Sequence, residues 1–336
     1  MVHTKATAKD GRCLAVNSWG PVDGYPIFLL HGMPGSRLGP RPHTRDLHLA
    51  GIRLITYDRP GYGGSTRLMG RRVSHAAHDV EAIAQQLGLD GFSVVGRSGG
   101  APHALACAAE LQPRVRSVAV LASLAPPDTA ELSWARGAWF NGMTESNVKA
   151  FRLAREDVEA LREELDLRGS AINADPEQII VGLDAELSER DRRIVMETGV
   201  QDMLVDNFSA AFDPAHRSRS HAQSADADET EAGALPTLDG WFDDAVSLVS
   251  PWGFDVAQVN VPTLVWQGGL DRFSPIDHFH WLAEHIKDAT ATLAPRDAHF
   301  GAVQALPRVL RWLVTAGRGG GYNEPAMNQA RTHARA

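Results

Sequence analysis

A serine stands among glycines at residues 96–100, in the run Gly-Arg-Ser-Gly-Gly. An apolar β-branched run precedes this stretch and a helix-forming run follows it. The spacing G-x-S-x-G between a strand and a helix is typical of a nucleophile held on a sharp, strained turn. Small neighbours are required because strand and helix approach closely there. The helix N-terminus also brings backbone N–H groups beside a developing oxyanion. The pattern predicts that Ser98 is a nucleophile.

A second turn of small residues lies at 31–36, in the run HGMPGS. It follows an apolar strand pattern, and its geometry can direct the Met33 N–H toward the site opposite Gly99. Two such N–H donors would form an oxyanion hole. A plain strand-to-helix turn capped by Ser36 also fits these residues, but it does not explain their coincidence with the serine turn. His31 is a candidate for contact with substrate and could compete as the base, but its place beside this turn suits a structural hydrogen bond better.

A serine needs a base, since its free hydroxyl is a weak nucleophile. Composition does not select one, because the chain holds 14 histidines. His299 follows a strand pattern at 289–295 and precedes the last expected helix, which places it at the same sheet edge as Ser98. Packing or solvation accounts for the histidines that fall within expected helices: His75, His78, His103, His278, His280 and His285.

An acid should orient the histidine from the end of another strand. Asp271 follows a strand and a Gly-Gly turn, 28 residues (299 − 271) before His299. This order of serine, acid and histidine is the one expected for the serine turn. Asp128, after the preceding strand, is an alternative acid. Asp277 falls in the first turn of an expected helix, where a carboxylate stabilises the helix dipole.

Strands and helices must bring these residues to one edge of a sheet. Over most of its length the chain alternates strand patterns with helix patterns. Strands are expected at 25–32, 51–58, 91–96, 115–123, 261–269 and 289–295, and helices at 74–88, 100–112, 275–286 and 301–316. A hairpin around Asp10-Gly11 should precede them. Continuous apolar strands alternating with helices predict an α/β fold, with a mostly parallel central sheet and helices on both faces.

The alternation stops in the middle of the chain. Helical patterns at 148–165 and 188–208 predict a helical cap inserted between two strands, with a polar, mobile loop at 216–233. The expected organisation is a core domain in two parts around this cap, followed by a flexible tail, with boundaries at 1–125, 126–259, 260–316 and 317–336.

Composition narrows the class of protein and its partners. The chain has 336 residues, 43% hydrophobic and 22% charged, with a net charge of −8. It is therefore expected to be globular and to bind neither nucleic acid nor a membrane. Cys13 and Cys107 are typical of free thiols in a reducing compartment, so the protein is expected to be cytoplasmic. It is expected to be a monomer or a homodimer. No motif for a metal or a nucleotide cofactor is evident, so none is expected.

The motifs HGMPGS, YDRPGYGGS, GRSGG, GGLDRFSP and DAHF occur in this order between about residues 10 and 315. Together they resemble the α/β-hydrolase superfamily, in the branch with proline iminopeptidases, carboxylesterases, lactonases and carbon–carbon bond hydrolases. The resemblance implies Ser98 as nucleophile, His299 as base and Asp271 as acid, with Met33 and Gly99 as oxyanion donors. Haloalkane dehalogenases and epoxide hydrolases carry an aspartate where this chain has Ser98, which argues against both.

Aromatic residues in the expected cap, including Trp139, Phe140 and Trp241, predict an apolar roof over the site. Packing of the cap helices against one another is the alternative role for each ring. Arg97 could meet a substrate carboxylate or could serve only the structure.

The sequence thus predicts a cofactor-free serine hydrolase that cleaves a hydrophobic carboxylic ester or lactone through an acyl-enzyme on Ser98. The same three residues also suit an amide or peptide hydrolase, a carbon–carbon bond hydrolase or an acyltransferase. A ligand-binding receptor or scaffold on the hydrolase fold is the alternative outside enzymes.

Overall fold

An open sheet of eight strands forms the centre of the molecule in the computed structural model, which describes residues 1–127, 138–174, 182–213 and 237–319. The strands are β1 (Val2–Thr7), β2 (Cys13–Trp19), β3 (Tyr25–Leu30), β4 (Ile52–Tyr57), β5 (Phe92–Arg97), β6 (Val115–Leu121), β7 (Thr263–Gly268) and β8 (Thr290–Ala294). Their order is β1-β2-β4-β3-β5-β6-β7-β8. β2 pairs antiparallel with β1 and β4, and all later neighbours are parallel. The predicted fold class is confirmed.

Helices cover both faces of the sheet. One face carries α2 (His75–Gln86), α3 (Ala101–Glu110) and α11 (Ile276–His285), and the other carries α1 (Thr44–Leu49) and α12 (Gly301–Gly317). Successive residues of a strand point to opposite faces. In β3, Phe28 and Leu30 therefore enter the first core, while Ile27 and Leu29 enter the second. This two-sided burial explains why the central strands are apolar throughout.

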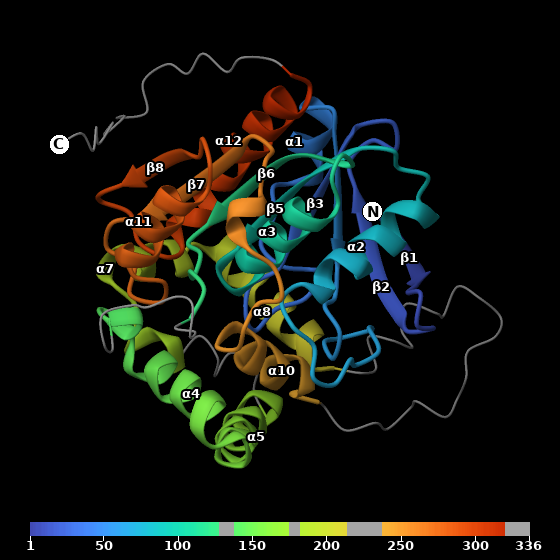
Figure 1. Ribbon diagram of the computed structural model, residues 1–336. Helices are drawn as coiled ribbons and strands as arrows, with labels where there is room; N and C mark the ends of the chain where they lie inside the picture. The colour runs from blue at the N-terminus through green and yellow to red at the C-terminus, as the bar shows by residue number, and fades with distance from the viewer. Residues whose placement is uncertain (128–137, 175–181, 214–236, 320–336) are drawn as a thin grey trace.

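A group of helices separates β6 from β7 in the chain, and we call it the inserted segment. Its described helices are α4 (Glu145–Glu156), α5 (Val158–Ala174), α7 (Glu189–Val195), α8 (Thr198–Phe212) and α10 (Asp239–Leu248), with short 3-10 turns η2 (Ala138–Phe140) and η4 (Val256–Gln258) at either end. In Figure 1, α4, α5 and α10 lie together below the sheet. The expected loop at 216–233 and the expected tail beyond 319 lie outside the described residues.

Two expected helical stretches are interrupted. The stretch at 148–165 breaks at Asp157, whose Oδ1 accepts the N–H of Ala160 at 3.0 Å and so begins α5. The stretch at 188–208 breaks between α7 and α8, where Glu197 leaves the helical conformation. Apolar periodicity did not reveal these breaks, since a polar cap residue fits a helical pattern equally well. None of the helices in the described ranges has the length and hydropathy needed to cross a bilayer.

Candidate active site

Ser98 lies at the turn between β5 and α3, with η1 (Ser98–Gly100) between them. Its φ is +53°, in the left-handed region that residues other than glycine rarely adopt. Glycine is required on both sides. A Cβ on Gly96 would stand 2.3 Å from the carbonyl oxygen of Gly100, and a Cβ on Gly100 would stand 2.3 Å from that of His31. The small residues thus allow a strained turn that holds the serine at the end of a central strand.

The backbones of Met33 and Gly99 face each other across this turn. A Cβ on Gly99 would stand 3.3 Å from the Met33 backbone nitrogen and 2.7 Å from the Met33 Cβ. A side chain at position 99 would therefore fill the gap between them. The arrangement places close together the two residues whose backbone N–H groups the sequence predicts as oxyanion donors.

His299 follows β8 and is hydrogen-bonded to Asp271, which follows β7. Its Nδ1 lies 2.9 Å from Oδ2 and 3.1 Å from Oδ1 of the carboxylate. Since a carboxylate accepts, the hydrogen is on Nδ1, and it is Nε2 that could take a proton when the ring is neutral. The ring also packs against Phe273, with centroids 5.0 Å apart. Both contacts fix the orientation of the imidazole.

Further donors surround the Asp271 carboxylate. Oδ1 accepts the N–H groups of Phe273 at 2.8 Å and Ser274 at 2.9 Å, and Oδ2 accepts the Gln267 side chain at 3.0 Å. Together with the histidine they hold both oxygens of a carboxylate that is almost fully buried. Of the alternative acids, Asp277 lies in the first turn of α11, as expected, and Asp128 lies outside the described residues.

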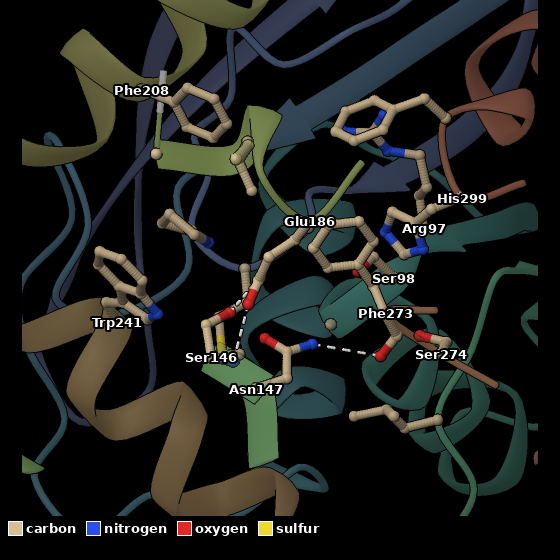
Figure 2. A pocket seen from close by; sticks show the side chains of 18 of the residues that line it. Arg97, Ser98, Ser146, Asn147, Glu186, Phe208, Trp241, Phe273, Ser274 and His299 are labelled. Carbon is tan, nitrogen blue, oxygen red and sulfur yellow. Dashed lines mark hydrogen bonds between the residues drawn. The ribbon is translucent and has the colours of Figure 1, made fainter. Parts of the chain in front are cut away.

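A cavity of about 600 Å³ opens between the sheet edge and the inserted segment, and Ser98, Gly99 and His299 line it. In the view of Figure 2, Ser98 and His299 lie on one side, with Phe208 and Trp241 on the other. Apolar side chains form much of its wall: Met33, Pro34, Leu124, Phe151, Leu183, Leu204, Phe208, Trp241, Leu248, Phe273 and Phe300. The site lies at the carboxyl ends of parallel strands, where ligands bind in open α/β sheets.

Comparison with known sequences decides the family, because the profile of the alpha/beta hydrolase fold family matches residues 25–304. The chain belongs to this family. A bifunctional esterase/perhydrolase from Acinetobacter calcoaceticus is 34% identical over 122 residues, 36% of this chain and 44% of that protein. A non-heme chloroperoxidase from Streptomyces lividans is 33% identical over the same shares. This hydrolase-fold chain thus matches less than half the length of these curated relatives.

Solved structures of this fold family resemble the chain over nearly its whole length. A bromoperoxidase from Bacillus anthracis superposes with a TM-score of 0.63 and 19% identity, over 93% of this chain and 99% of that one. An esterase from Thermogutta terrifontis gives 0.58 and 21%, over 94% and 100%. An enol-lactonase from Burkholderia xenovorans gives 0.57 and 17%, over 93% and 100%. At such identities the likeness shows the fold alone.

In this α/β hydrolase, His31 lies in the turn at residues 31–36, which we call the oxyanion turn after its predicted role, with both ring nitrogens engaged. Nε2 accepts the backbone N–H of Arg59 at 3.1 Å, so Nδ1 carries the hydrogen and donates to the Gly32 carbonyl at 2.8 Å. Burial lowers the pKa of His31 well below its ordinary value, which keeps the ring neutral. These contacts fit the structural role considered for His31 rather than a contact with substrate, since both ring nitrogens already have backbone partners.

A buried ion-pair network supports the same turn from the inserted segment. Asp244 of α10 accepts the Arg59 guanidinium at 2.5 Å, that of Arg71 at 2.6 Å and the Tyr62 hydroxyl at 2.8 Å. Arg59 also donates to the carbonyls of His31 and, at 2.9 Å, Gly32. Burial alone would raise the pKa of Asp244, but the two guanidinium groups outweigh it and hold that pKa far below its usual range.

The inserted segment also reaches the loop of His299, through Asp191 of α7. The Asp191 carboxylate accepts the backbone N–H of Phe300 at 2.7 Å and that of His299 at 3.3 Å. Burial raises the pKa of Asp191, although His299 and the Phe300 N–H partly offset this effect. The Ser188 hydroxyl accepts the Asp191 N–H at 3.0 Å and caps α7, but no signal in the sequence indicated the bonds of the Asp191 carboxylate to the histidine loop.

Aromatic residues of the inserted segment take two different positions. Trp241 lines the cavity. Trp139 is fully buried, and its ring contacts those of Phe140, Phe151 and His278 at centroid distances of 5.0, 5.4 and 5.2 Å. Trp139 and Phe140 therefore lie in the packing that joins the inserted segment to the core, while Trp241 faces the space above Ser98.

Polar groups interrupt the apolar wall at a few places. Glu186 accepts the N–H of Ser146 at 2.8 Å and its hydroxyl at 2.5 Å, and Asn147 donates to the Phe273 carbonyl at 3.2 Å, as Figure 2 shows. Arg97 also lines the cavity. Within the described ranges, no group of three or more His, Cys, Asp or Glu side chains is placed to hold a metal ion.

Proposed function

We propose that this chain is a serine hydrolase that cleaves a hydrophobic carboxylic ester or lactone through an acyl-enzyme on Ser98. One observation carries the proposal. A serine with a left-handed backbone and a histidine hydrogen-bonded to a buried aspartate, His299 and Asp271, line or adjoin a single cavity. A binding protein would have no use for this combination, since a strained serine and an oriented base contribute nothing to affinity.

The reaction follows from the placement of the groups. The Ser98 hydroxyl attacks the carbonyl while His299 Nε2 accepts its proton, and Asp271 stabilises the imidazolium through Nδ1–H. The N–H groups of Met33 and Gly99 stabilise the oxyanion. His299 then returns the proton to the leaving alcohol. A water molecule, activated by the same ring, hydrolyses the acyl-enzyme, and no electron carrier or metal is required.

The inserted segment acts as the cap of the site in this proposal. Its side chains Phe151, Phe208 and Trp241 line the same cavity as Ser98. Each buried methylene of a substrate contributes up to about 0.8 kcal/mol of binding. Butyrate to octanoate esters, or aryl esters, should therefore be cleaved better than acetate esters.

Covalent labelling tests the proposal directly. A fluorophosphonate should add one adduct mass to the intact chain, and Ser98→Ala should abolish both labelling and the hydrolysis of p-nitrophenyl esters. Circular dichroism and the melting temperature of Ser98→Ala control for folding. A Ser98→Ala protein with full esterase activity would exclude Ser98 as the nucleophile.

Transfer of the acyl group to hydrogen peroxide is a second candidate, because relatives at 33–36% identity are named esterase/perhydrolase, chloroperoxidase and haloperoxidase. Peroxide would attack the same acyl-enzyme in place of water, releasing a peracid and restoring the Ser98 hydroxyl. Halogenation of monochlorodimedone in the presence of acetate, bromide and peroxide measures this activity. Loss of that signal in Ser98→Ala would distinguish it from free peroxide chemistry.

A further inference from the structure

We propose that Arg97 forms a carboxylate-binding subsite beside the nucleophile, and that the substrate is an ester or lactone carrying a carboxylate near its scissile carbonyl. This inference rests on the proposed function and names the class of substrate within it. The subsite would add one charged contact to a cavity whose other contacts with substrate are mostly apolar.

The Arg97 guanidinium lines the cavity without a partner. Within the part of the chain that the structure describes, it makes no ion pair within 4.0 Å and donates no hydrogen bond. A guanidinium away from bulk water is costly to keep uncompensated. Burial accordingly lowers the pKa of Arg97 to about 10, so the group still carries its charge at neutral pH. A cation held in this way is available to an anion that enters the cavity.

Other arginines in this region are already matched. Arg168, which lines the same cavity, pairs with Glu164 at 2.9 Å. Arg59 and Arg71 pair with Asp244 beneath the oxyanion turn. Arg97 thus differs from its neighbours in lacking a carboxylate of the protein.

Arg97 is also close to the reacting atoms. The point at which a Gly32 Cβ would stand lies 3.9 Å from Arg97 Nη2 and 3.6 Å from the Ser98 Cβ. Gly32 precedes Met33, which supplies one of the proposed oxyanion donors. A carboxylate bound to the guanidinium would therefore be only a few bonds from the carbonyl that Ser98 attacks.

Guanidinium geometry favours a carboxylate as the anion. The planar fork of arginine binds both oxygens of a carboxylate in parallel, whereas lysine offers a single point of charge. The remaining cavity wall is mostly apolar, so it would contact the hydrocarbon part of such a molecule. Hydrogen bonds to a charged group of this kind correspond to a preference of about 10- to 100-fold.

Matched ester pairs test the subsite. Monoethyl glutarate replaces the terminal methyl of ethyl valerate with a carboxylate on the acyl side, and 3-(butyryloxy)propionate does the same to propyl butyrate on the alcohol side. The ratio of kcat/KM within each pair is measured for the native chain, Arg97→Gln, Arg97→Lys and Arg168→Gln. Arg168→Gln is the control, because it removes a cavity cation whose charge is already matched.

We expect at least one pair to favour the carboxylate, with a ratio that falls about 10- to 100-fold in Arg97→Gln and less in Arg97→Lys. Arg168→Gln should keep the native ratio. Equal rates within both pairs for the native chain, or a ratio that survives Arg97→Gln, would overturn the subsite. If Arg97→Gln lowered kcat/KM equally for both esters of a pair, the subsite would also be overturned, because Arg97 would then act on the reaction that both esters share.

A binding measurement separates this inference from the proposed function. Calorimetric titration of Ser98→Ala with the preferred carboxylate ester needs no turnover, and adding Arg97→Gln should weaken binding about 10- to 100-fold. Failure of the native chain to be labelled or to hydrolyse any ester would count against the proposed function alone. Unchanged binding in the double variant would count against the subsite alone.

Discussion

Acidification should weaken the fold at His278, a histidine buried between the core and the inserted segment. Its Nδ1 accepts the N–H of Ala125 at 3.0 Å, and its Nε2 lies 2.9 Å from the Trp139 carbonyl oxygen. A neutral ring with its hydrogen on Nε2 satisfies both contacts. A proton added to Nδ1 would face the Ala125 N–H, one donor against another. Burial also disfavours the charged ring and lowers the pKa of His278 from 6.5 to about 4.

The sign and size of the effect follow from these two pKa values. Because the unfolded chain takes up the proton first as the pH falls, the contribution of His278 to stability is complete above its unfolded pKa. It is lost progressively between about pH 6.5 and about pH 4. At about pH 5 the loss in the free energy of unfolding reaches about 2 kcal/mol.

Urea unfolding of the native chain and of His278→Gln, at about pH 7.5 and about pH 5, measures this contribution. Glutamine can accept and donate at the same site but does not titrate, so the variant should be less stable at the higher pH. The difference in unfolding free energy should narrow by about 2 kcal/mol on acidification. Other buried histidines, such as His103, titrate in both proteins and cancel. An equal difference at both pH values would refute the reasoning.

Three substitutions test the site, and two further ones serve as controls. Asp271→Asn should lower kcat by roughly 10³–10⁴, by analogy with serine proteases, whereas Asp277→Asn should be nearly silent in the same ester assay. Asp191→Ala leaves two loop N–H groups unpaired and should lower kcat about 10- to 100-fold through misplacement of the histidine, with little change in KM; an unchanged kcat would contradict this. Trp241→Ala should flatten the dependence of kcat/KM on acyl length, whereas Trp139→Ala should lower the melting temperature and leave that dependence intact.

Much of the site could be predicted from the sequence because its parts follow strand ends. Ser98, Asp271 and His299 each follow the end of an expected strand within a few residues, and parallel strands bring their carboxyl ends to one edge. The meeting of His299 with Asp271 therefore required only the strand assignments. The glycines near Ser98 could be interpreted in the same way, since close approach of strand and helix leaves no room for a Cβ.

For the inserted segment, the sequence predicts helices but not the surfaces on which they pack. An amphipathic pattern shows that a helix has a buried face but not which surface it packs against. Trp139 and Trp241 are equivalent in sequence, and only tertiary packing places one in the interior and the other at the cavity. The contacts of Asp191 and Asp244 join residues more than a hundred positions apart, which no local spacing can reveal.

The inserted segment is bonded to each of the three loops on which the proposed chemistry depends. Asp191 holds the histidine loop, Asn147 binds the carbonyl of Phe273 in the acid loop, and Asp244 orders the oxyanion turn through Arg59. Replacing this segment with that of another hydrolase would therefore alter the positions of these loops as well as the substrate specificity. A chimera would need the grafted segment to keep these three contacts. Without them it would have a new substrate pocket, but the three loops beneath that pocket would no longer be held in place.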